Sequence, residues 1–550
     1  MRAPGTGCPV PHFSRSLREV GSSSPHHNAP SKPFILLEPV PNCGFRDTIS
    51  PVQPKNINQP KTPSPSAVDL SILALVTAAG AALRLHALTV KSLWFDEGVS
   101  VGIARLDAYN FVRILWRREA NMSLYYLLLR GWLHFGYNEA FIRSLSVLFG
   151  IAAIPAIYFL GRSLFDSRIG LTSAALLCVN SYHVRYSQEA RSYSLTVFLC
   201  LLSSLYFLKL LESPSRRSRL PYICFSALAV YSHFFSGLML LAHWLWLRFL
   251  DPRPVPKEAK RIWLHLVLAV SPVIAFIATT GAGPLSWIQH PGLHDLWQLA
   301  LDWTGNGGAL LVLLYAAACF VAVSGSAGPK NRFLLLWIFF PVLLVLAVSI
   351  ARPVFLPRYF FFSLPALMLL AASGLARIRA RWAFAAILLA FLGMSLRGVG
   401  GFYRERATSA DENWRAASQY LLANTRPGDA LVFHIAMGRM PYEYYRTLQI
   451  ASTGGPDVLY PHHSAQITFL DFVEKPNYAQ LGAEIPQHPR VWLVFYGATS
   501  PSGLDKTASA LLTMISNMIS NSEPIADRHD FGGIQIVLCS KPPAANKATQ

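Results

Sequence analysis

The chain has few charged residues and no pattern among its cysteines. Of its 550 residues, 14% are charged and 52% are hydrophobic, whereas an average soluble domain carries about 25% charged residues. This deficit argues against a soluble protein and indicates a membrane protein. The seven cysteines show neither metal-ligand spacing nor a disulfide framework. Four of them fall in apolar runs, where we expect packing roles: Cys178, Cys200, Cys224 and Cys319.

A basic soluble region of the kind that binds nucleic acid is also missing, although the net charge is +19. The Lys and Arg residues fall mostly in short gaps between apolar runs. Cytoplasmic loops of membrane proteins carry such an excess of positive charge. The sequence therefore predicts membrane lipids, and no nucleic acid, as partners.

Apolar runs and polar gaps alternate over residues 67–400, which we predict to be the membrane domain. Residues 1–66 are rich in Pro, Ser and Asn and have no continuous apolar core, so we expect a disordered tail rather than a signal peptide. A helix crosses a bilayer with about 20 apolar residues. The candidate spans are 69–90, 141–160, 169–184, 193–211, 220–232, 234–250, 262–281, 308–325, 333–351, 359–376 and 382–398.

The charge of the gaps between the apolar runs indicates on which side of the membrane each gap lies. The gaps at 212–219 and 251–261 are both basic, so both belong on the cytoplasmic side. The apolar run between them must then cross twice, with a break near Ser232-His233. About eleven crossings follow, with the N-terminus in the cytoplasm and the C-terminus outside. We therefore predict a multi-pass protein of the cytoplasmic (inner) membrane.

Residues 401–550 differ in composition and predict a small α/β domain on the extracytoplasmic, periplasmic side. Runs of β-branched and aromatic residues indicate strands, and helical periodicity indicates helices. We expect helices at 411–425 and 505–521 and strands at 430–435, 490–497 and 533–540. The predicted fold is thus a polytopic α-helical membrane protein with a small C-terminal α/β domain.

Ionisable residues gather on the predicted outer side of the membrane. Taken singly, each has an ordinary explanation: a solvated Asp-Glu pair, a Glu189–Arg191 ion pair, or arginines that extend to the membrane surface. Their position on the same predicted side of the membrane indicates function more strongly than any one of them alone. The candidates are Asp96, Glu97, Arg185, Glu189, Arg191, His233 and Arg358.

Carboxylates and arginines at this surface suit the transfer of a sugar from a lipid phosphate. Arg binds a phosphate leaving group through its planar fork, and a carboxylate removes the proton of the acceptor hydroxyl. The phosphate departs without protonation, so one catalytic carboxylate suffices, unlike in glycoside hydrolysis. Two alternatives remain open: a transporter or flippase for an anionic lipid or solute, and a non-catalytic membrane scaffold.

The order of motifs resembles one family of membrane enzymes. The motifs are SLWFDEGVS, NMSLYYLLLRGW, YSQEARSY and PRYFFFSLPALMLLAASGL. Over residues 69–376 the chain is similar to the GT-C glycosyltransferases related to protein mannosyltransferases and the lipid A aminoarabinose transferase. Residues 413–429 also resemble the start of the tail domain in many bacterial members.

The resemblance implies an inverting hexosyl- or pentosyltransferase. Its donor would be a polyprenyl-phosphate sugar, and its acceptor a hydroxyl group of a protein, lipid or glycan. Asp96 is implied to be the general base, and Glu97 its orienting partner or a second polar contact. Arg191 and Arg358 are implied to hold the donor phosphate. Further substrate-binding roles fall to Glu189, His233 and Arg185.

Two points of the family pattern are unsettled in this chain. Relatives often carry a Pro pair where Met122-Ser123 stands here, which leaves the path of the first outer loop open. Some relatives hold a divalent cation near this site and others work without one. One His and scattered carboxylates do not define a ligand set, so a metal or other cofactor is left undecided.

Overall fold

The computed structural model describes residues 64–540, except for 252–257, 281–287, 325–327, 410, 450–455, 462–465, 498, 501–502, 505 and 520–524. The predicted N-terminal tail therefore lies outside the described residues, apart from positions 64–66.

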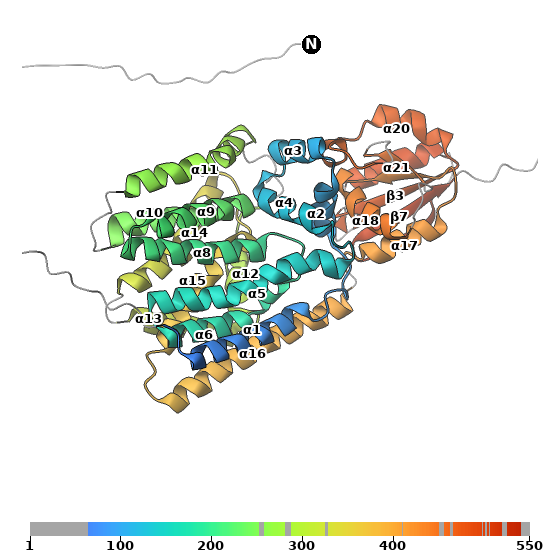
Figure 1. Cartoon of the computed structure of the whole chain (residues 1–550). Helices are drawn as coiled ribbons and strands as arrows, with labels where there is room; N and C mark the ends of the chain where they lie inside the picture. The colour runs from blue at the N-terminus through green and yellow to red at the C-terminus, as the bar shows by residue number, and fades with distance from the viewer. Residues whose placement is uncertain are drawn as a thin grey trace, which may run out of the picture. The chain divides into compact units, whose positions relative to one another are not determined.

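The described chain is helical from its start to Thr408 (Figure 1). In order, the helices are α1 (Ala67–Leu85), α2 (Phe95–Arg105), α3 (Ala108–Arg117), α4 (Ser123–Trp132), α5 (Glu139–Leu164), α6 (Ser167–Cys178), α7 (Ser181–Ser187), α8 (Tyr193–Glu212), α9 (Arg216–Ser232), α10 (Gly237–Leu245), α11 (Ala259–Thr280), α12 (Leu293–Thr304), α13 (Ala309–Val323), α14 (Pro329–Ala351), α15 (Leu364–Leu375) and α16 (Arg381–Thr408). Shorter turns between them are η1 (Ala120–Met122), η2 (Phe234–Ser236), the π-helical η3 (Trp246–Leu250) and η5 (Pro357–Ser363).

The protein is a multi-pass membrane protein. Within the described residues, seven helical segments are long and apolar enough to cross a bilayer, and the bent pair α12–α13 would make an eighth. Each of the eleven predicted runs contains helix, but α6, α9 and the segment Phe234–Leu250 are shorter than 18 residues. The count of eleven crossings therefore stays a prediction.

Several boundaries differ from the sequence-based expectation. The first run ends at Leu85 rather than at residue 90, because His86 is extended and Ala87 has a left-handed φ of 59°. The run 169–184 divides after Cys178 into α6 and α7. The predicted break at Ser232-His233 is confirmed, since α9 ends at Ser232. The packing role expected for Cys224 is wrong, because this residue is exposed on α9.

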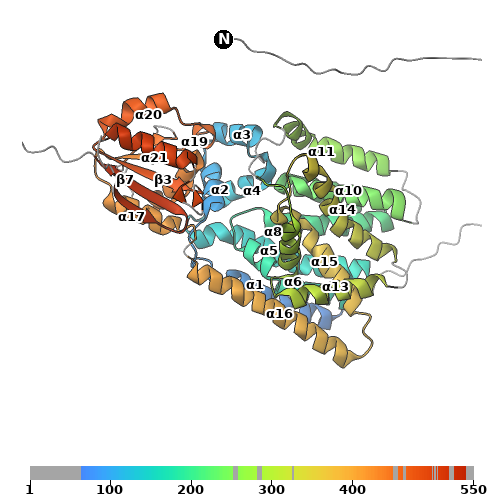
Figure 2. The ribbon, with the colours of Figure 1, turned by 180° about the vertical axis from the view of Figure 1, so that it is seen from behind.

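The segment between α1 and α5 is helical. Its helices α2, α3 and α4 lie between the long helices and the C-terminal sheet in both views (Figure 2). Asp107 caps α3 by accepting from the amides of Tyr109 and Asn110. Such an N-cap satisfies donors that the helix itself leaves unpaired.

A small α/β fold follows α16. Its helices are α17 (Trp414–Asn424), α18 (Arg439–Gln449), α19 (Leu470–Val473), α20 (Tyr478–Glu484) and α21 (Lys506–Ile519). Its main sheet has the order β2-β1-β3-β7-β6, with β1 (Ala430–Phe433), β2 (Asp457–Tyr460), β3 (Arg490–Tyr496), β6 (Ile525–Asp530) and β7 (Ile534–Ser540). The short strands β4 (Thr499–Ser500) and β5 (Gly503–Leu504) pair separately. The strand β1 is parallel to β2 and β3, whereas β7 is antiparallel to β3 and β6.

The elements expected in this region are present, and others were missed. The three predicted strands correspond to β1, β3 and β7, and the two predicted helices to α17 and α21. The strands β2 and β6 and the helix α18 had not been expected. Since α18 carries the residues that meet α2, the missed helix matters most for the site.

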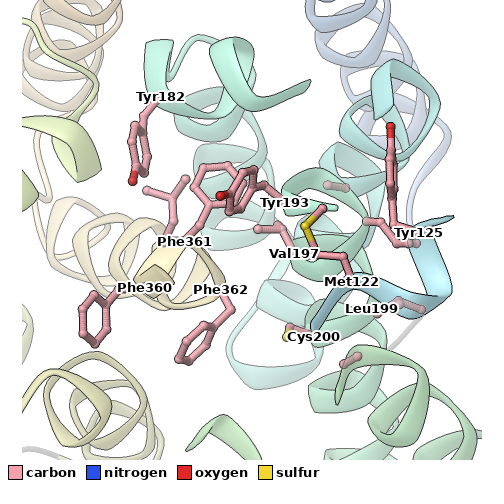
Figure 3. Close-up of a cluster of buried hydrophobic side chains, with 14 of the residues drawn as sticks. Met122, Tyr125, Tyr182, Tyr193, Val197, Leu199, Cys200, Phe360, Phe361 and Phe362 are labelled. Carbon is pink, nitrogen blue, oxygen red and sulfur yellow. The ribbon is translucent and has the colours of Figure 1, made fainter. Parts of the chain in front are cut away.

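A buried aromatic cluster holds η5 against α7 and α8. The ring of Phe361 lies 5.1 Å from that of Tyr182, 5.2 Å from that of Tyr186 and 6.2 Å from that of Tyr193. Figure 3 shows Phe361 between Tyr182 and Tyr193. Aromatic pairs in such arrangements add about 0.5–1.5 kcal/mol each beyond burial. The cluster therefore fixes the turn that also carries Arg358.

The α13–α15 contact gives a test of the helical packing. A Cβ at Gly374 would lie 1.9 Å from the backbone oxygen of Ala318, so Gly374→Ala forces these helices apart. We expect a loss of about 1–3 kcal/mol, measured as a lower Tm in detergent. The matched control is Gly393→Ala in α16, where a Cβ meets nothing within 4 Å. An unchanged Tm for Gly374→Ala would contradict the close approach.

Candidate functional site

The first turn of α2 sends two adjacent carboxylates into different surroundings. Asp96 keeps a side chain that is 23% exposed, whereas the side chain of Glu97 is 0% exposed. The N-cap residue, Trp94, supplies no side-chain acceptor, and its own amide donates to Glu97. The two neighbouring carboxylates thus lie in different environments. The sequence alone could not predict which contacts each one makes.

Glu97 is held in a buried network with Arg143 of α5. The guanidinium donates to both carboxylate oxygens, at 2.8 Å from Nε and 2.6 Å from Nη2. The amide of Ala190 donates to the same carboxylate at 2.8 Å. Burial by itself would raise the pKa of Glu97, but the charge and hydrogen bonds of Arg143 bring the pKa below its ordinary value. The role expected for Glu97 stays a prediction.

Arg143 also organises the chain that leads into α2. It donates to the backbone oxygens of Leu88, Lys91 and Ser92. One buried cation therefore joins the end of the first span, the start of α2 and the segment after α7. Such a bidentate, multiply satisfied pair is rigid.

Asp96 faces Arg191. The two side chains approach to 3.6 Å between Nη2 and Oδ2. Arg191 also donates to the hydroxyl of Ser100 at 3.2 Å, and that hydroxyl donates to the backbone oxygen of Asp96 at 2.8 Å. The Glu189–Arg191 pair considered from the sequence is thus replaced by Arg191–Asp96.

Glu189 pairs with Arg185 instead. Their ion pair is 3.4 Å between Nε and Oε1. The other oxygen, Oε2, is buried and accepts no hydrogen bond within the described part of the chain. Burial raises the pKa of this carboxyl, and Arg185 partly offsets the effect. An unsatisfied buried acceptor of this kind is a place where a ligand donor would bind favourably.

Arg358 and His233 approach from later elements. Arg358 lies on η5, close enough to Asp96 for their charges to interact. His233 follows α9 and is buried, with its ring 5.3 Å from that of Tyr359 and 6.0 Å from that of Tyr193. The break after α9 is tied to η1 by Phe234, whose amide donates to the side chain of Asn121.

A cavity of about 160 Å³ adjoins α2. Four of the predicted site residues line it: Glu97, Arg185, Glu189 and Arg358. Asp96, Arg191 and His233 are not among its lining residues. The other lining residues are Lys91, Ser92, Trp94, Arg143, Tyr186, Phe402, Glu405, Arg406 and Glu412. The cavity is therefore rich in charges of both signs.

Buried polar atoms in the cavity wall have unused hydrogen-bonding capacity. Besides Glu189 Oε2, they are the indole nitrogen of Trp94 and Nε of Arg406, which make no hydrogen bond within the described residues. Leaving such a group unsatisfied costs about 1–3 kcal/mol. The wall thus suits a small ligand that carries several donors and acceptors.

No group of three or more His, Cys, Asp or Glu side chains is placed for metal binding among the described residues. The carboxylates near Asp96 are instead interleaved with arginines. Metal dependence stays undecided, as it was from the sequence.

The sequence reasoning missed the two residues that hold α2 most directly, Arg143 and Glu412. Arg143 had a detectable signature, because it is a charge near the start of an apolar run, where ionisable residues are costly unless paired. Glu412 had none, since its position depends on the fold of the C-terminal domain.

Comparison with known proteins supports the fold and shows a family similarity over part of the chain. The family described as dolichyl-phosphate-mannose-protein mannosyltransferase matches residues 123–279, a segment that begins after Asp96. No curated protein matches the chain.

Solved structures with the same fold include ArnT from Cupriavidus metallidurans, in the apo state and bound to undecaprenyl phosphate. Each has a TM-score of 0.57 and 13% sequence identity, covering 86% of this chain and 98% of ArnT. The archaeal oligosaccharyltransferase AglB from Archaeoglobus fulgidus has a TM-score of 0.49 and 13% identity, covering 78% of this chain and 69% of AglB. The family match favours sugar transfer over the transporter alternative.

Breaking the buried pair between Glu97 and Arg143 should lower stability strongly, and a second substitution should recover part of the loss. Arg143→Met leaves Glu97 as an unpaired buried charge, which costs about 3–5 kcal/mol. We expect a large fall in Tm in detergent. The double variant Glu97→Gln/Arg143→Met removes the charge and should recover part of that loss. Equal Tm values for the single and double variants would contradict the pairing.

Proposed function

We propose that the chain is a GT-C membrane glycosyltransferase, as the family match over residues 123–279 supports, and that it transfers a sugar from a polyprenyl-phosphate donor to an acceptor hydroxyl with Asp96 as general base. The observation that carries this assignment is the contrast within the first turn of α2. Asp96 is partly exposed beside Arg191, while Glu97 is buried in its pair with Arg143. Of the two carboxylates, only Asp96 is both partly exposed and close to a cationic side chain.

The chemical step requires one proton transfer and one substitution. Asp96 accepts the proton of the acceptor hydroxyl, and the oxygen attacks the anomeric carbon from the face opposite the phosphate. The bond between that carbon and the phosphate oxygen breaks with its electrons, so the configuration inverts. The lipid phosphate leaves as an anion, and the proton stays on Asp96 until solvent removes it.

In this proposal Arg191 and Arg358 stabilise the leaving phosphate. Both lie near Asp96 yet come from different parts of the chain, one before α8 and one on η5. Arginine binds phosphate through parallel hydrogen bonds and keeps its charge throughout. Its interaction strengthens as the negative charge of the leaving group develops, which lowers the barrier.

The charged cavity is our candidate site for the sugar. Its unsatisfied polar atoms would pair with sugar hydroxyls, and Glu189 and Arg185 would contribute to orientation. His233 lies beside Tyr193 and Tyr359, where it would border the same ligand. A polar site of this kind rejects ligands that lack the matching hydroxyls.

The lipid chain has a candidate site below the phosphate. The turn η5 that carries Arg358 leads directly into α15, whose Leu367 and Leu370 line an apolar cavity of about 540 Å³. The other walls come from α12, α13 and α14. The structure of ArnT with bound undecaprenyl phosphate supports a polyprenyl phosphate as the lipid carrier.

We assign the site to the extracytoplasmic face of the inner membrane. The basic gaps identified in the sequence then face the cytoplasm. In this orientation the domain at 401–550 is periplasmic, and the acceptor is a protein, lipid or glycan of the cell envelope. Mass spectrometry of envelope glycans from a deletion strain would identify both the sugar and the acceptor.

Asp96→Asn should reduce the transfer rate by about 10²- to 10⁴-fold, the usual contribution of a general base. The reaction to measure is release of undecaprenyl phosphate from a panel of undecaprenyl-phosphate hexoses and pentoses, with envelope extract as acceptor. The matched control is Asp457→Asn, an exposed carboxylate at the start of β2. Transfer by Asp96→Asn at the wild-type rate would rule out the base assignment.

Arg358→Ala and Arg191→Ala should weaken binding of undecaprenyl phosphate, because each removes a charge-assisted hydrogen bond worth about 1.5–3 kcal/mol. That range corresponds to about 10- to 100-fold in Kd. Native mass spectrometry of protein in nanodiscs measures the affinity, with Arg352→Ala, an exposed arginine near the same turn, as control. Unchanged affinity in both variants would remove them from the phosphate site.

A further inference from the structure

Glu412 brings a carboxylate from the C-terminal domain into the wall of the charged cavity. It lies two residues before α17, and its φ of 53° is in the left-handed region. For a residue other than glycine this conformation is strained and persists only where surrounding contacts impose it. The position therefore raises the question of what its side chain does.

The backbone of Glu412 is fixed by the hairpin between β6 and β7. The amide of Glu412 donates to the oxygen of Gly532 at 2.7 Å, and the amide of Asn413 donates to the oxygen of Phe531 at 3.0 Å. The oxygen of Glu412 accepts from the hydroxyl of Ser92 at 2.9 Å. The strained residue is thus held between the C-terminal sheet and the chain that leads into α2.

The side chain supplies what the N-terminus of α2 lacks. The first amides of a helix have no partner within the helix, and Trp94 provides no side-chain cap. Glu412 accepts from the amide of Phe95 through Oε2 at 3.0 Å. A carboxylate at this end also interacts favourably with the helix dipole.

A second contact fixes the residue that Glu412 caps. The ring of Tyr496 stacks on that of Phe95 at 4.5 Å between centroids. Burial raises the pKa of Glu412, and the amide of Phe95 offsets part of this shift. Glu412 is therefore a cap in trans, contributed by a distant segment to the turn that carries Asp96.

We propose that Glu412 is a positioning residue for Asp96, so that the C-terminal domain completes the active site. The proposal rests on the proposed base role of Asp96. Docking of the domain has other supports, among them the pair Arg415–Glu139 and the close approach of Pro441 to Gly98. The contact of Glu412 with Phe95 acts on the first turn of α2 itself, where it sets the direction of the Asp96 side chain.

Three variants at one position separate positioning from folding. Glu412→Gln retains an acceptor for the amide of Phe95. Glu412→Ala removes the acceptor and keeps the strained backbone, whereas Glu412→Gly removes both the acceptor and the strain. The control is Asp411→Asn, an exposed neighbour whose side chain bonds to Ser409.

We expect kcat to fall about 10- to 100-fold in both the Ala and Gly variants, because a small displacement of a catalytic group has that effect. KM for the undecaprenyl-phosphate sugar that the wild type uses best should change less than kcat. The Gln variant should restore most of kcat. The Gly variant should have a Tm at or above that of the Ala variant. If Glu412 had only a structural role, a variant with this Tm would not lose activity.

Hydrogen exchange measured by mass spectrometry tests the same contact without activity. The amides of residues 93–98 should exchange faster in the Ala and Gly variants than in the wild type and in Glu412→Gln. Normal kcat in the Ala variant, or unchanged exchange, would overturn the proposal, as would equal loss in the Gln and Ala variants. If the wild type transfers no sugar, the proposed function fails, and the exchange data alone decide whether Glu412 positions α2.

Discussion

The buried pair between Glu97 and Arg143 is the constraint on which the site depends. Through it, one guanidinium joins the end of α1, the entrance to α2 and the segment between α7 and α8. Removing two charges from water is costly, so the pair is stable only because nearly all their hydrogen-bonding groups are used. Because Glu97 is fixed in this pair, the neighbouring Asp96 points elsewhere and meets Arg191.

The periodicity and hydropathy of the sequence sufficed for the general fold. Long apolar runs identified the spanning helices, and basic gaps located the break at His233, since both report on the bilayer as a solvent. The division between α6 and α7 was missed because a run of apolar residues does not reveal where its axis turns. The strand β2 and the helix α18 were missed because tertiary contacts outweigh local preference there.

The candidate site was predictable in its composition but not in its pairing. The acidic pair and the arginines at 185, 191 and 358 stood out as charges beside apolar runs, and the structure brings them close together. Which cation meets which carboxylate depends on the rotation of short helices by a fraction of a turn. From sequence spacing, Glu189 and Arg191 could form an ion pair. In the folded chain Arg191 pairs with Asp96, and Arg185 pairs with Glu189.

The contact between Ser92 and Glu412 joins residues 320 positions apart. The ribosome therefore makes Asp96 long before it makes β6 and β7, the hairpin that holds Glu412. The spans can therefore insert while the site is still incomplete. The site is therefore completed only after β6 and β7 have been synthesised and have packed beside α2.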